Sequence, residues 1–424
     1  VENSQKKQFD SILKKNNCLK VISTTINHKE IDHYLYFFNE KILHIHVYFK
    51  LFTGNSISKN YDLTNFCDFF ENKFFNEKYG LWIMDYNLQM ILFKIRIAIK
   101  NDTFLGRYLI NRDLINLKEE YTFLNSNYNS NRITKIKNNI NNSEINPNSL
   151  SYSYSEKKKI YSHLKLYRSK SILRTTIDEI IFLYRVVLKR IFKFKKFRLK
   201  NKMIIFISGP DASGKSTISL KLKNIFNNYL NTKIYNIAKP YPSVLISFFI
   251  KRKYFSNKKN KYKMNKRSNL NEVSIKNIIK DLNLSFLRFI YSVLIFRFSF
   301  FKNILIFDRY VSENINDING PRINVRNKKY LKFFSSLEVF FYKKIKTLDL
   351  EYKLNTSLDD CLLRNNLRKK NVIKTSKEVS DRFLQFQKSK FKVNKTIIID
   401  NNKDIKISVN EIIRNIFIYY HENY

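Results

Sequence analysis

Glycine is rare in this chain, and two of its six glycines lie in one short segment. Gly209-Pro-Asp-Ala-Ser-Gly-Lys-Ser-Thr217 follows the apolar run Met203-Ile-Ile-Phe-Ile207 and precedes a stretch with helical spacing. The spacing matches G-x-x-x-x-G-K-[ST], a turn between strand and helix that wraps a phosphate with backbone N–H groups. A chance match at this composition is expected about once in several hundred chains. The segment therefore predicts a phosphate-binding loop within an alternating α/β architecture.

The residue types of this loop predict how it would hold a nucleotide. Glycine lets the backbone approach a phosphate closely, and the following helix directs its positive end at the anion. Lys215 is expected to bridge the β- and γ-phosphates of ATP, and the Ser216 hydroxyl is expected to ligate Mg²⁺. The residues expected to bind ATP are Gly209, Asp211, Ser213, Gly214, Lys215, Ser216 and Thr217.

Strand-like apolar runs alternate with helical stretches throughout the C-terminal half. They predict a P-loop NTPase fold with a five-stranded parallel sheet, preceded by a smaller α+β N-terminal domain. The expected strands are 203–207, 233–238, 303–308, 350–355 and 396–400. Asp308 ends the third strand, where a carboxylate can hold the water shell of Mg²⁺. Ser216 and Asp308 are therefore the expected metal residues.

The residues after the third strand add a family resemblance. Asp308-Arg309-Tyr310 resembles the D-R-[YF] motif of the thymidylate kinase family, and Asp211 matches the Asp of that family's loop. The segment 317–323, Asp-Ile-Asn-Gly-Pro-Arg-Ile, is similar to the D-G-P-R-I segment of a subgroup often linked to bacterial surface polysaccharide genes. The resemblance covers residues 203–416, and Ala212 departs from it where the family usually has Gly.

The resemblance implies further site roles. Arg309 would grip the phosphate of the acceptor, Asp308 would assist near the metal, and Asp211 would face the acceptor ribose. Arg364 and Arg368 match arginines of a lid that closes over the ATP phosphates; a solvated basic helix face is the alternative reading. The catalytic residues expected on this basis are Lys215, Asp308, Arg309, Arg364 and Arg368.

The rest of the chain divides by composition into four parts. Residues 1–124 mix short aromatic strands with helices, 125–155 form an Asn- and Ser-rich linker, 156–200 form a basic helical connector with an apolar stripe, and 201–424 form the kinase-type domain. Within this last part, the insertion at 241–302 is expected to be helical, and the most apolar stretch, 284–307, is expected to form a helix followed by a strand. The stretch 44–54 is similar to segments of nucleotidyltransferase-like domains. The Gly-Ser and paired-aspartate signature of that chemistry is absent, so no catalysis is expected in residues 1–124.

Charge and cysteine content constrain partners and compartment. The formal net charge is +44, and the inflated Lys, Asn, Ile, Phe and Tyr content is typical of an AT-rich genome rather than of a nucleic-acid-binding surface. No specific nucleic acid is expected, whereas a membrane-surface contact and a homodimer are both left open. Three scattered cysteines indicate a reducing compartment, and we expect a cytoplasmic protein.

Three functions fit these features. The leading one is an ATP-dependent phosphotransferase of the thymidylate kinase type, which moves the γ-phosphoryl group to a nucleoside monophosphate or a related small acceptor. A nucleic-acid-binding P-loop ATPase would use the basic insertion at 241–302 as a phosphate track, but it leaves Asp308-Arg309-Tyr310 unexplained. A catalytically weak ATP-binding scaffold in surface polysaccharide assembly would bind nucleotide without transferring phosphate.

Overall fold

The structure is a computed structural model of the 424-residue chain. It describes residues 6–26, 28, 30–38, 40–54, 57–64, 73–77, 80–102, 104–127, 140, 143–238, 240, 275–299, 302–315, 317–323, 329–367, 374–402 and 404–423. Most of the basic insertion, and with it the predicted helical character of 241–274, lies outside these residues.

Contacts divide the chain into two compact units, each with its own core. The N-terminal unit comprises residues 1–16, 23–34 and 45–194, and the C-terminal unit comprises 17–22, 35–44 and 195–424. The domain boundaries expected from composition differ from this division, because two short N-terminal segments belong to the C-terminal unit.

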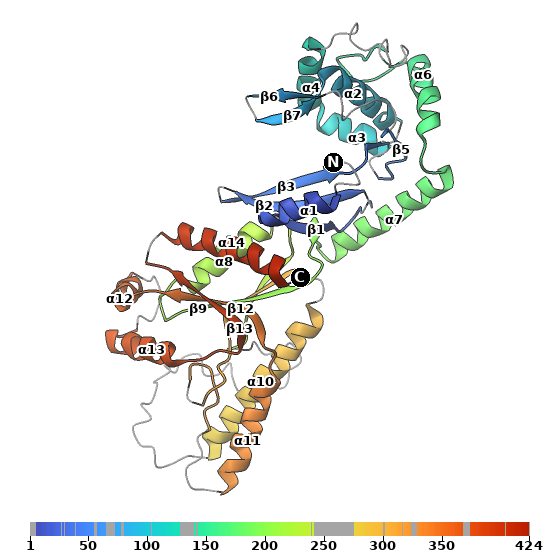
Figure 1. The fold of residues 1–424 in the computed structure, drawn as a ribbon. Coiled ribbons are helices and arrows are strands. Elements are labelled where there is room, and N and C mark those ends of the chain that lie inside the picture. Colours follow the sequence, from blue (N-terminus) through green and yellow to red (C-terminus); the bar gives the residue numbers. More distant parts are fainter. Residues whose placement is uncertain are drawn as a thin grey trace. The chain divides into compact units, whose positions relative to one another are not determined.

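A five-stranded parallel sheet forms the centre of the C-terminal unit (Figure 1). Its order is β10-β11-β9-β12-β13, with every neighbouring pair parallel. All five strands predicted from apolar runs are present, and the expected α/β sheet is confirmed. The strands are β9 (Met203–Ser208), β10 (Thr232–Asn236), β11 (Ile304–Arg309), β12 (Leu348–Asn355) and β13 (Val393–Asp400); the helices are α8 (Lys215–Phe226), α10 (Ile275–Phe298), α11 (Lys329–Lys344), α12 (Leu358–Asn366), α13 (Ser376–Lys388) and α14 (Ile405–Asn423).

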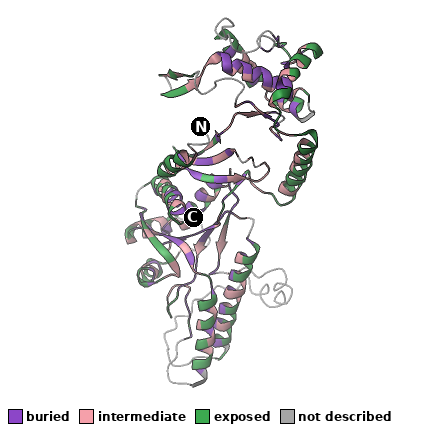
Figure 2. Cartoon of the chain, turned by 45° about the vertical axis from the view of Figure 1, so that its right-hand side comes forward, coloured by how far each residue is buried: buried purple, intermediate pink, exposed green. Residues whose placement is uncertain are grey.

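Alternate residues of the central strand pack against opposite helix layers, as the two-residue period of a strand requires. Met203, Ile205 and Ile207 lie in one core with residues of α8 and α14. Ile204 and Phe206 lie in a second core with residues of α10 and α11. All six residues of β9 are buried, and Figure 2 shows purple, buried stretches on the strands of this sheet. Burial on both faces explains why β9 reads as a continuous apolar run and places its carboxyl end between two rigid layers.

The N-terminal unit has a helical core around α2 (Tyr86–Lys100). Asp85 caps this helix by accepting a hydrogen bond from the backbone N–H of Asn87. Ile140 and Leu150, both within the predicted Asn- and Ser-rich linker, are buried in the same core. The other elements assigned wholly to this unit are α1 (Lys6–Lys15), β4 (Phe52–Thr53), β5 (Tyr61–Asp62), β6 (Lys73–Asn76), β7 (Leu81–Met84), α3 (Phe104–Arg112), α4 (Leu114–Ser126), α6 (Tyr154–Leu164), the 3-10 helix η3 (Lys165–Tyr167) and α7 (Ile172–Ile191).

A second sheet, of order β3-β2-β1-β8, includes strands that the division between the units cuts. Its strands are β1 (Leu19–Ser23), β2 (Ile31–Phe38), β3 (Lys41–Tyr48) and β8 (Phe197–Arg198). Five apolar side chains of the short N-terminal segments are buried in the same core as β9, α8 and α14: Leu19, Val21, Leu35, Phe37 and Ile42. Their burial is the physical reason that residues 17–22 and 35–44 group with the C-terminal unit.

The most apolar stretch of the sequence, 284–307, forms the end of α10 and most of β11. This agrees with the expected helix followed by a strand. Among the described residues, no helix is both long and apolar enough to span a membrane.

Candidate active site

The phosphate-binding loop connects the buried strand β9 to helix α8. Gly214 precedes α8 with a φ of +86°, a left-handed conformation that glycine adopts without a Cβ clash. At Gly209, a Cβ atom would meet the Ser213 Oγ at 2.4 Å and the Leu354 Cβ at 3.2 Å. Both glycines are therefore required by the local geometry. The loop ends at the N-terminus of a twelve-residue helix, where unpaired N–H groups favour an anion.

Ala212 also has left-handed backbone geometry, with a φ of +72°. This conformation costs a non-glycine residue about 1–2 kcal/mol. Ala212 is buried, and its methyl group packs in a small cluster with Cys361 and Val379. Ala212, which stands where the thymidylate kinase family usually has Gly, thus has a strained backbone conformation. The apolar packing of its methyl group partly offsets the energetic cost of that conformation.

Lys215 lies at the mouth of this loop. Its Nζ atom donates hydrogen bonds to the carbonyl oxygens of Gly209 at 2.8 Å and Pro210 at 2.5 Å. Its positive charge helps to lower the pKa of the Asp211 carboxyl and partly opposes the effect of burial, which raises the pKa of the Asp308 carboxyl. The ammonium is therefore close to both carboxylates and to the loop backbone, as expected for the lysine of this motif.

Asp308 lies near the carboxyl end of β11, next to the loop. Parallel pairing aligns Phe307 with Phe206, so the ends of β11 and β9 meet at the same edge of the sheet. The Oδ1 atom of Asp308 is buried and has no hydrogen-bond partner within the described part of the chain. Burial raises the pKa of this carboxyl, while the charges of Arg309 and Lys215 and hydrogen bonding to the Ser216 hydroxyl act in the opposite direction.

Ser216 and Asp308 therefore fit a hydrated Mg²⁺ ion. A hydroxyl and a buried, partly unsatisfied carboxylate lie together beside the loop, and oxygen donors are the ligands that Mg²⁺ prefers. No group of three or more His, Cys, Asp or Glu side chains that could bind a metal occurs among the described residues. The site thus suits an ion that is held largely by water and phosphate oxygens.

Asp211 forms ion pairs instead of pointing into open space. Its Oδ2 atom accepts hydrogen bonds from the Lys374 Nζ and, at 2.9 Å, from the Arg382 Nη1 on α13. Burial acts to raise the pKa of the Asp211 carboxyl, but its hydrogen bond to Lys374 and three nearby cations outweigh burial and hold it well below the usual range. The expected role of Asp211 at the acceptor ribose stays a prediction.

Arg364 reaches the loop through Asn401. Its Nη2 atom donates to the Asn401 backbone carbonyl at 2.9 Å, and the Asn401 Nδ2 donates to the Ser213 carbonyl at 2.6 Å. The helix α12 and the end of β13 thus support the back of the loop. Arg368, the second expected lid arginine, lies outside the described residues.

Arg309 follows Asp308 and is half-buried. It lies close enough to Asp308 for its charge to lower the pKa of that carboxyl. No ion pair of the Arg309 guanidinium is found in the described ranges. Next to it, Tyr310 is buried and donates its hydroxyl to the Lys346 carbonyl. The structure thus brings together Lys215, Ser216, Asp308 and Arg309 beside the loop.

Sequence reasoning missed the buried cation on α10. Arg288 is 2% exposed and donates through its Nη1 to the Asn319 carbonyl at 3.0 Å and through its Nη2 to the Ala238 carbonyl at 2.8 Å. It also donates to the Tyr342 hydroxyl. Arg288 therefore connects the end of β10, α11 and the 317–323 segment that carries the family resemblance. Its only sequence signal is that it is the one charged residue between Asp281 and Arg297 of α10.

Lys374, Arg382 and Asn401 were missed for a different reason. They contact Asp211 and Ser213 across 163, 171 and 188 sequence positions respectively. No local pattern marks such distant partners. Only the parallel order of the strands brings the end of β13 and the start of α13 to the loop.

Comparisons with known proteins were made for the whole chain. No protein-family model matches it, and no curated protein matches it in sequence. A solved structure of deoxyadenosine kinase from M. mycoides with bound dATP aligns with a TM-score of 0.31 and 14% identity, covering 50% of this chain and 99% of that chain. A structure of the same enzyme with dCMP and dCDP aligns with a TM-score of 0.30, 14% identity and coverages of 50% and 98%. Matches at this level assign no function.

Proposed function

We propose that the C-terminal unit is an ATP-dependent phosphotransferase of the thymidylate kinase type. One observation carries the proposal most strongly: a half-buried Asp308, whose buried Oδ1 atom has no hydrogen-bond partner among the described residues, lies beside Lys215 and Ser216 at the edge where β11 and β9 end. This arrangement matches the needs of γ-phosphoryl transfer, which depends mainly on positioning and charge stabilisation.

The residues of the chain have distinct parts in this proposal. The loop backbone and the N-terminus of α8 bind the phosphates of ATP, and Lys215 leaves the Gly209 and Pro210 carbonyls to contact the outer phosphates. Ser216 and Asp308 hold Mg²⁺, which when bound neutralises phosphate charge. Arg309 binds the phosphate of the acceptor beside the metal residues. The acceptor is a nucleoside monophosphate or a related small molecule.

A panel of acceptors tests the reaction class. ADP formation from ATP should depend on an added nucleoside monophosphate, nucleoside or sugar phosphate. Lys215→Ala should reduce that transfer by at least 100-fold and leave the thermal unfolding midpoint unchanged within a few degrees, because the Lys215 side chain is half-buried at the loop and lies outside the apolar core. ATP turnover that is stimulated by DNA or RNA and indifferent to every small acceptor would favour the nucleic-acid ATPase instead.

A further inference from the structure

The N-terminal unit contains a cavity of about 660 Å³. One side of α2 lines it through Phe93, Arg96 and Lys100, and Trp82 of β7 and Lys59 complete much of the wall. This volume lies within the range of small-molecule sites, about 300–1,000 Å³. No catalysis was expected in this part of the chain.

Three cations line this cavity. The charges of Lys100 and Arg96 both act on Lys59, whose pKa is lowered first by burial and then by these neighbours. Arg96 pairs with Glu120 at 2.6 Å through its Nη2, but its Nε atom is buried without a hydrogen-bond partner among the described residues. The cavity wall therefore carries more positive than negative charge, and bringing these cations together has an energetic cost that an anion would relieve.

The backbone beside the cations is constrained as well. Gly54 lines the cavity with a φ of +134°, and a Cβ atom there would lie 2.2 Å from the Asn60 Oδ1. Lys59 itself has a φ of +48°, an uncommon conformation for a residue with a side chain. Strained backbone of this kind persists where the surrounding structure holds a functional geometry.

We propose that this cavity binds a phosphorylated small molecule of about nucleotide size. The cations suit a phosphate group, since Arg and Lys side chains form strong charge-assisted hydrogen bonds with phosphate oxygens. Trp82, which is 64% exposed, offers aromatic surface to the remaining part of the ligand. The site would be separate from the ATP-binding loop, and it does not depend on the proposed kinase activity.

Calorimetric titration of the full chain tests this site, with Lys215→Ala in the background to disable the ATP loop. Inorganic phosphate, a nucleoside monophosphate and a sugar phosphate are the probes. We expect at least one to bind with 1:1 stoichiometry, and Lys59→Gln with Lys100→Gln to weaken binding by at least 30-fold. The matched control is Lys14→Gln with Lys15→Gln on α1, which removes the same charge from an exposed helix.

Several results of the titration would contradict the proposed site. If inorganic phosphate binds as tightly as the two larger probes, the cavity recognises only a simple anion. That result would contradict the proposal of a ligand of about nucleotide size. Binding weakened equally by both double variants would show non-specific attraction to a basic protein. No binding of any probe, or binding unchanged by Lys59→Gln with Lys100→Gln, would overturn the proposal.

A different observation concerns α7, which has no buried residue along its twenty positions. Its apolar side chains occupy a continuous arc that faces solvent; Leu173 is 78% exposed, Ile180 61% and Tyr184 64%. Figure 2 shows the helix exposed along its length. The sequence predicts an apolar stripe here, and such a stripe usually faces a core.

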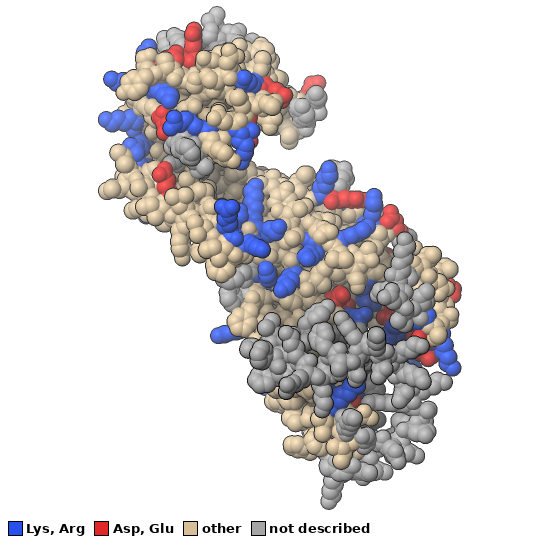
Figure 3. All heavy atoms as spheres, turned by 180° about the vertical axis from the view of Figure 1, so that it is seen from behind, with Lys and Arg blue, Asp and Glu red and all other residues tan. Residues whose placement is uncertain are grey.

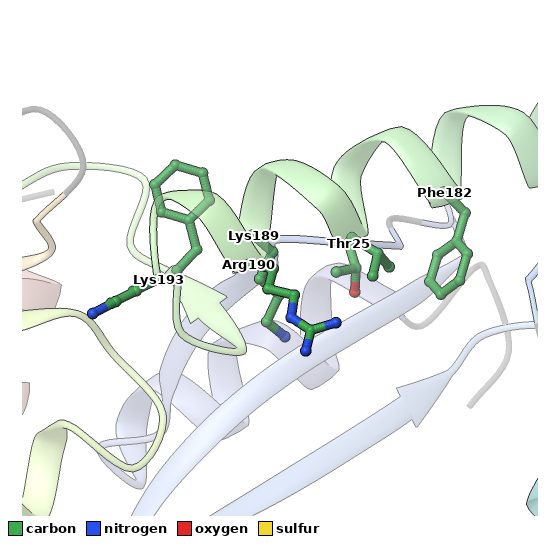
Figure 4. A pocket seen from close by; sticks show the side chains of 7 residues that line it. Thr25, Phe182, Lys189, Arg190 and Lys193 are labelled. Carbon is green, nitrogen blue, oxygen red and sulfur yellow. The ribbon is translucent and has the colours of Figure 1, made fainter.

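The polar arc of α7 faces the N-terminal unit instead. Asp178 pairs with Lys170 at 2.7 Å, and the Arg185 Nη1 donates to the Thr25 carbonyl at 3.2 Å. Figure 4 shows Phe182 and Arg190 beside Thr25, around a hollow of about 490 Å³. The helix is thus attached by a side that carries polar groups together with Phe182, and its wider apolar side is left uncovered.

The surroundings of α7 are strongly basic. Across the chain, Lys and Arg outnumber Asp and Glu by 79 to 35, and the face in Figure 3 shows Lys and Arg spread widely. Only Asp178 and Glu179 are acidic between residues 165 and 200, whereas the basic residues are Lys165, Arg168, Lys170, Arg174, Arg185, Lys189, Arg190, Lys193, Lys195, Lys196, Arg198 and Lys200. A second copy with a net charge of +44 would be repelled by this segment.

We infer that α7 binds an acidic membrane surface. An amphipathic helix with an exposed apolar face and nearby Lys and Arg residues lies in the plane of the lipid headgroups, where anionic lipids attract the cations. The apolar arc would enter the acyl boundary while the polar arc stays against the protein.

Vesicle flotation of the full chain tests the inference. The protein should float with vesicles that contain phosphatidylglycerol and not with pure phosphatidylcholine. Leu173→Ser, Ile180→Ser and Val187→Ser together should reduce flotation by at least 10-fold. The matched control, Ile115→Ser, Phe333→Ser and Ile407→Ser, removes exposed apolar side chains from other helices and should not change it. Unchanged flotation of the α7 variant, or self-association through α7 without lipid binding, would contradict the inference.

Discussion

At the scale of single residues, the site depends on two carboxylates in opposite environments. Asp308 has a buried oxygen without a described partner and a raised pKa, whereas Asp211 pairs with Lys374 and Arg382 and has a lowered pKa. A carboxylate whose ionised form is poorly solvated is suited to a metal-bound state, and one that is fully paired is suited to holding a loop in place.

These opposite shifts predict opposite effects on stability. Ionising Asp308 costs more free energy in the folded state than in the unfolded state. The Asp308 carboxyl therefore has no destabilising effect below the ordinary Asp pKa, and its full destabilising effect above the raised pKa of the folded state. Asp308→Asn should therefore increase the free energy of unfolding at pH 7, and the gain should disappear toward pH 3.5. Urea unfolding at both pH values measures this, while transfer activity should be lost.

Asp211→Asn is the matched control at the same loop. Because its folded-state pKa lies below the unfolded value, the Asp211 carboxylate stabilises the fold above the unfolded pKa and loses that effect as pH falls through the folded value. Asp211→Asn should lose stability at pH 7, and the loss should begin to shrink only below about pH 4. A stability loss at pH 7 for Asp308→Asn as well would contradict this account of the two carboxylates.

At the scale of elements, α12, α13 and the end of β13 form the support of the loop. Arg364 of α12 donates to Asn401, Asn401 donates to Ser213, and Arg382 of α13 pairs with Asp211. Asn401 and Arg382 contact the loop directly, Arg364 reaches it through Asn401, and all three residues lie at least 140 positions further along the chain. Correct packing of this C-terminal segment is therefore needed before the loop has a defined shape.

Arg364→Ala tests whether this arginine supports the loop. A hydrogen bond from a charged donor contributes about 1.5–3 kcal/mol, and the half-buried position of Arg364 favours the lower end. We expect a loss of about 1.5 kcal/mol in unfolding free energy and a raised KM for ATP. Arg414→Ala, on the exposed face of α14, is the control. A 100-fold lower kcat with unchanged stability would instead support the lid role that the resemblance implies.

At the scale of the whole molecule, local sequence pattern predicts most of the strands of the C-terminal unit. It does not predict the N-terminal segments that complete the core of this unit. The five strands and the loop were predicted because apolar runs and a fixed glycine spacing are local signals. The grouping of Leu19 and Phe37 with the C-terminal core was not, since pairing across more than 150 residues leaves no local trace. The solvent-facing orientation of the α7 stripe was missed because periodicity shows a face but not its partner.

The burial of N-terminal strands predicts how the C-terminal unit behaves alone. A fragment of residues 195–424 lacks the five apolar side chains that β1, β2 and β3 place in its core. Each such side chain stabilises a fold by about 1.5–3 kcal/mol, and the total is comparable with the stability of a typical domain, about 5–15 kcal/mol.

We therefore expect this fragment to be insoluble or largely unfolded by circular dichroism. Coexpression with a peptide of residues 17–48 should restore a cooperative unfolding transition. A cooperative transition of the fragment alone, at the midpoint of the full chain, would show that β1, β2 and β3 do not stabilise the unit.

The central claim is that Arg309 binds the phosphate of an acceptor beside the metal residues, and one pair of rates on one variant tests it. In Arg309→Ala, loss of a charge-assisted contact of about 2–4 kcal/mol should lower acceptor-dependent kcat/KM by roughly 30- to 1,000-fold. Arg309→Lys should recover only part of the lost kcat/KM, because a single ammonium cannot reproduce the two parallel hydrogen bonds of the planar guanidinium. Acceptor-free ATP hydrolysis should stay within about two-fold of the unmodified protein. Loss of that hydrolysis with intact transfer to the acceptor would contradict the account.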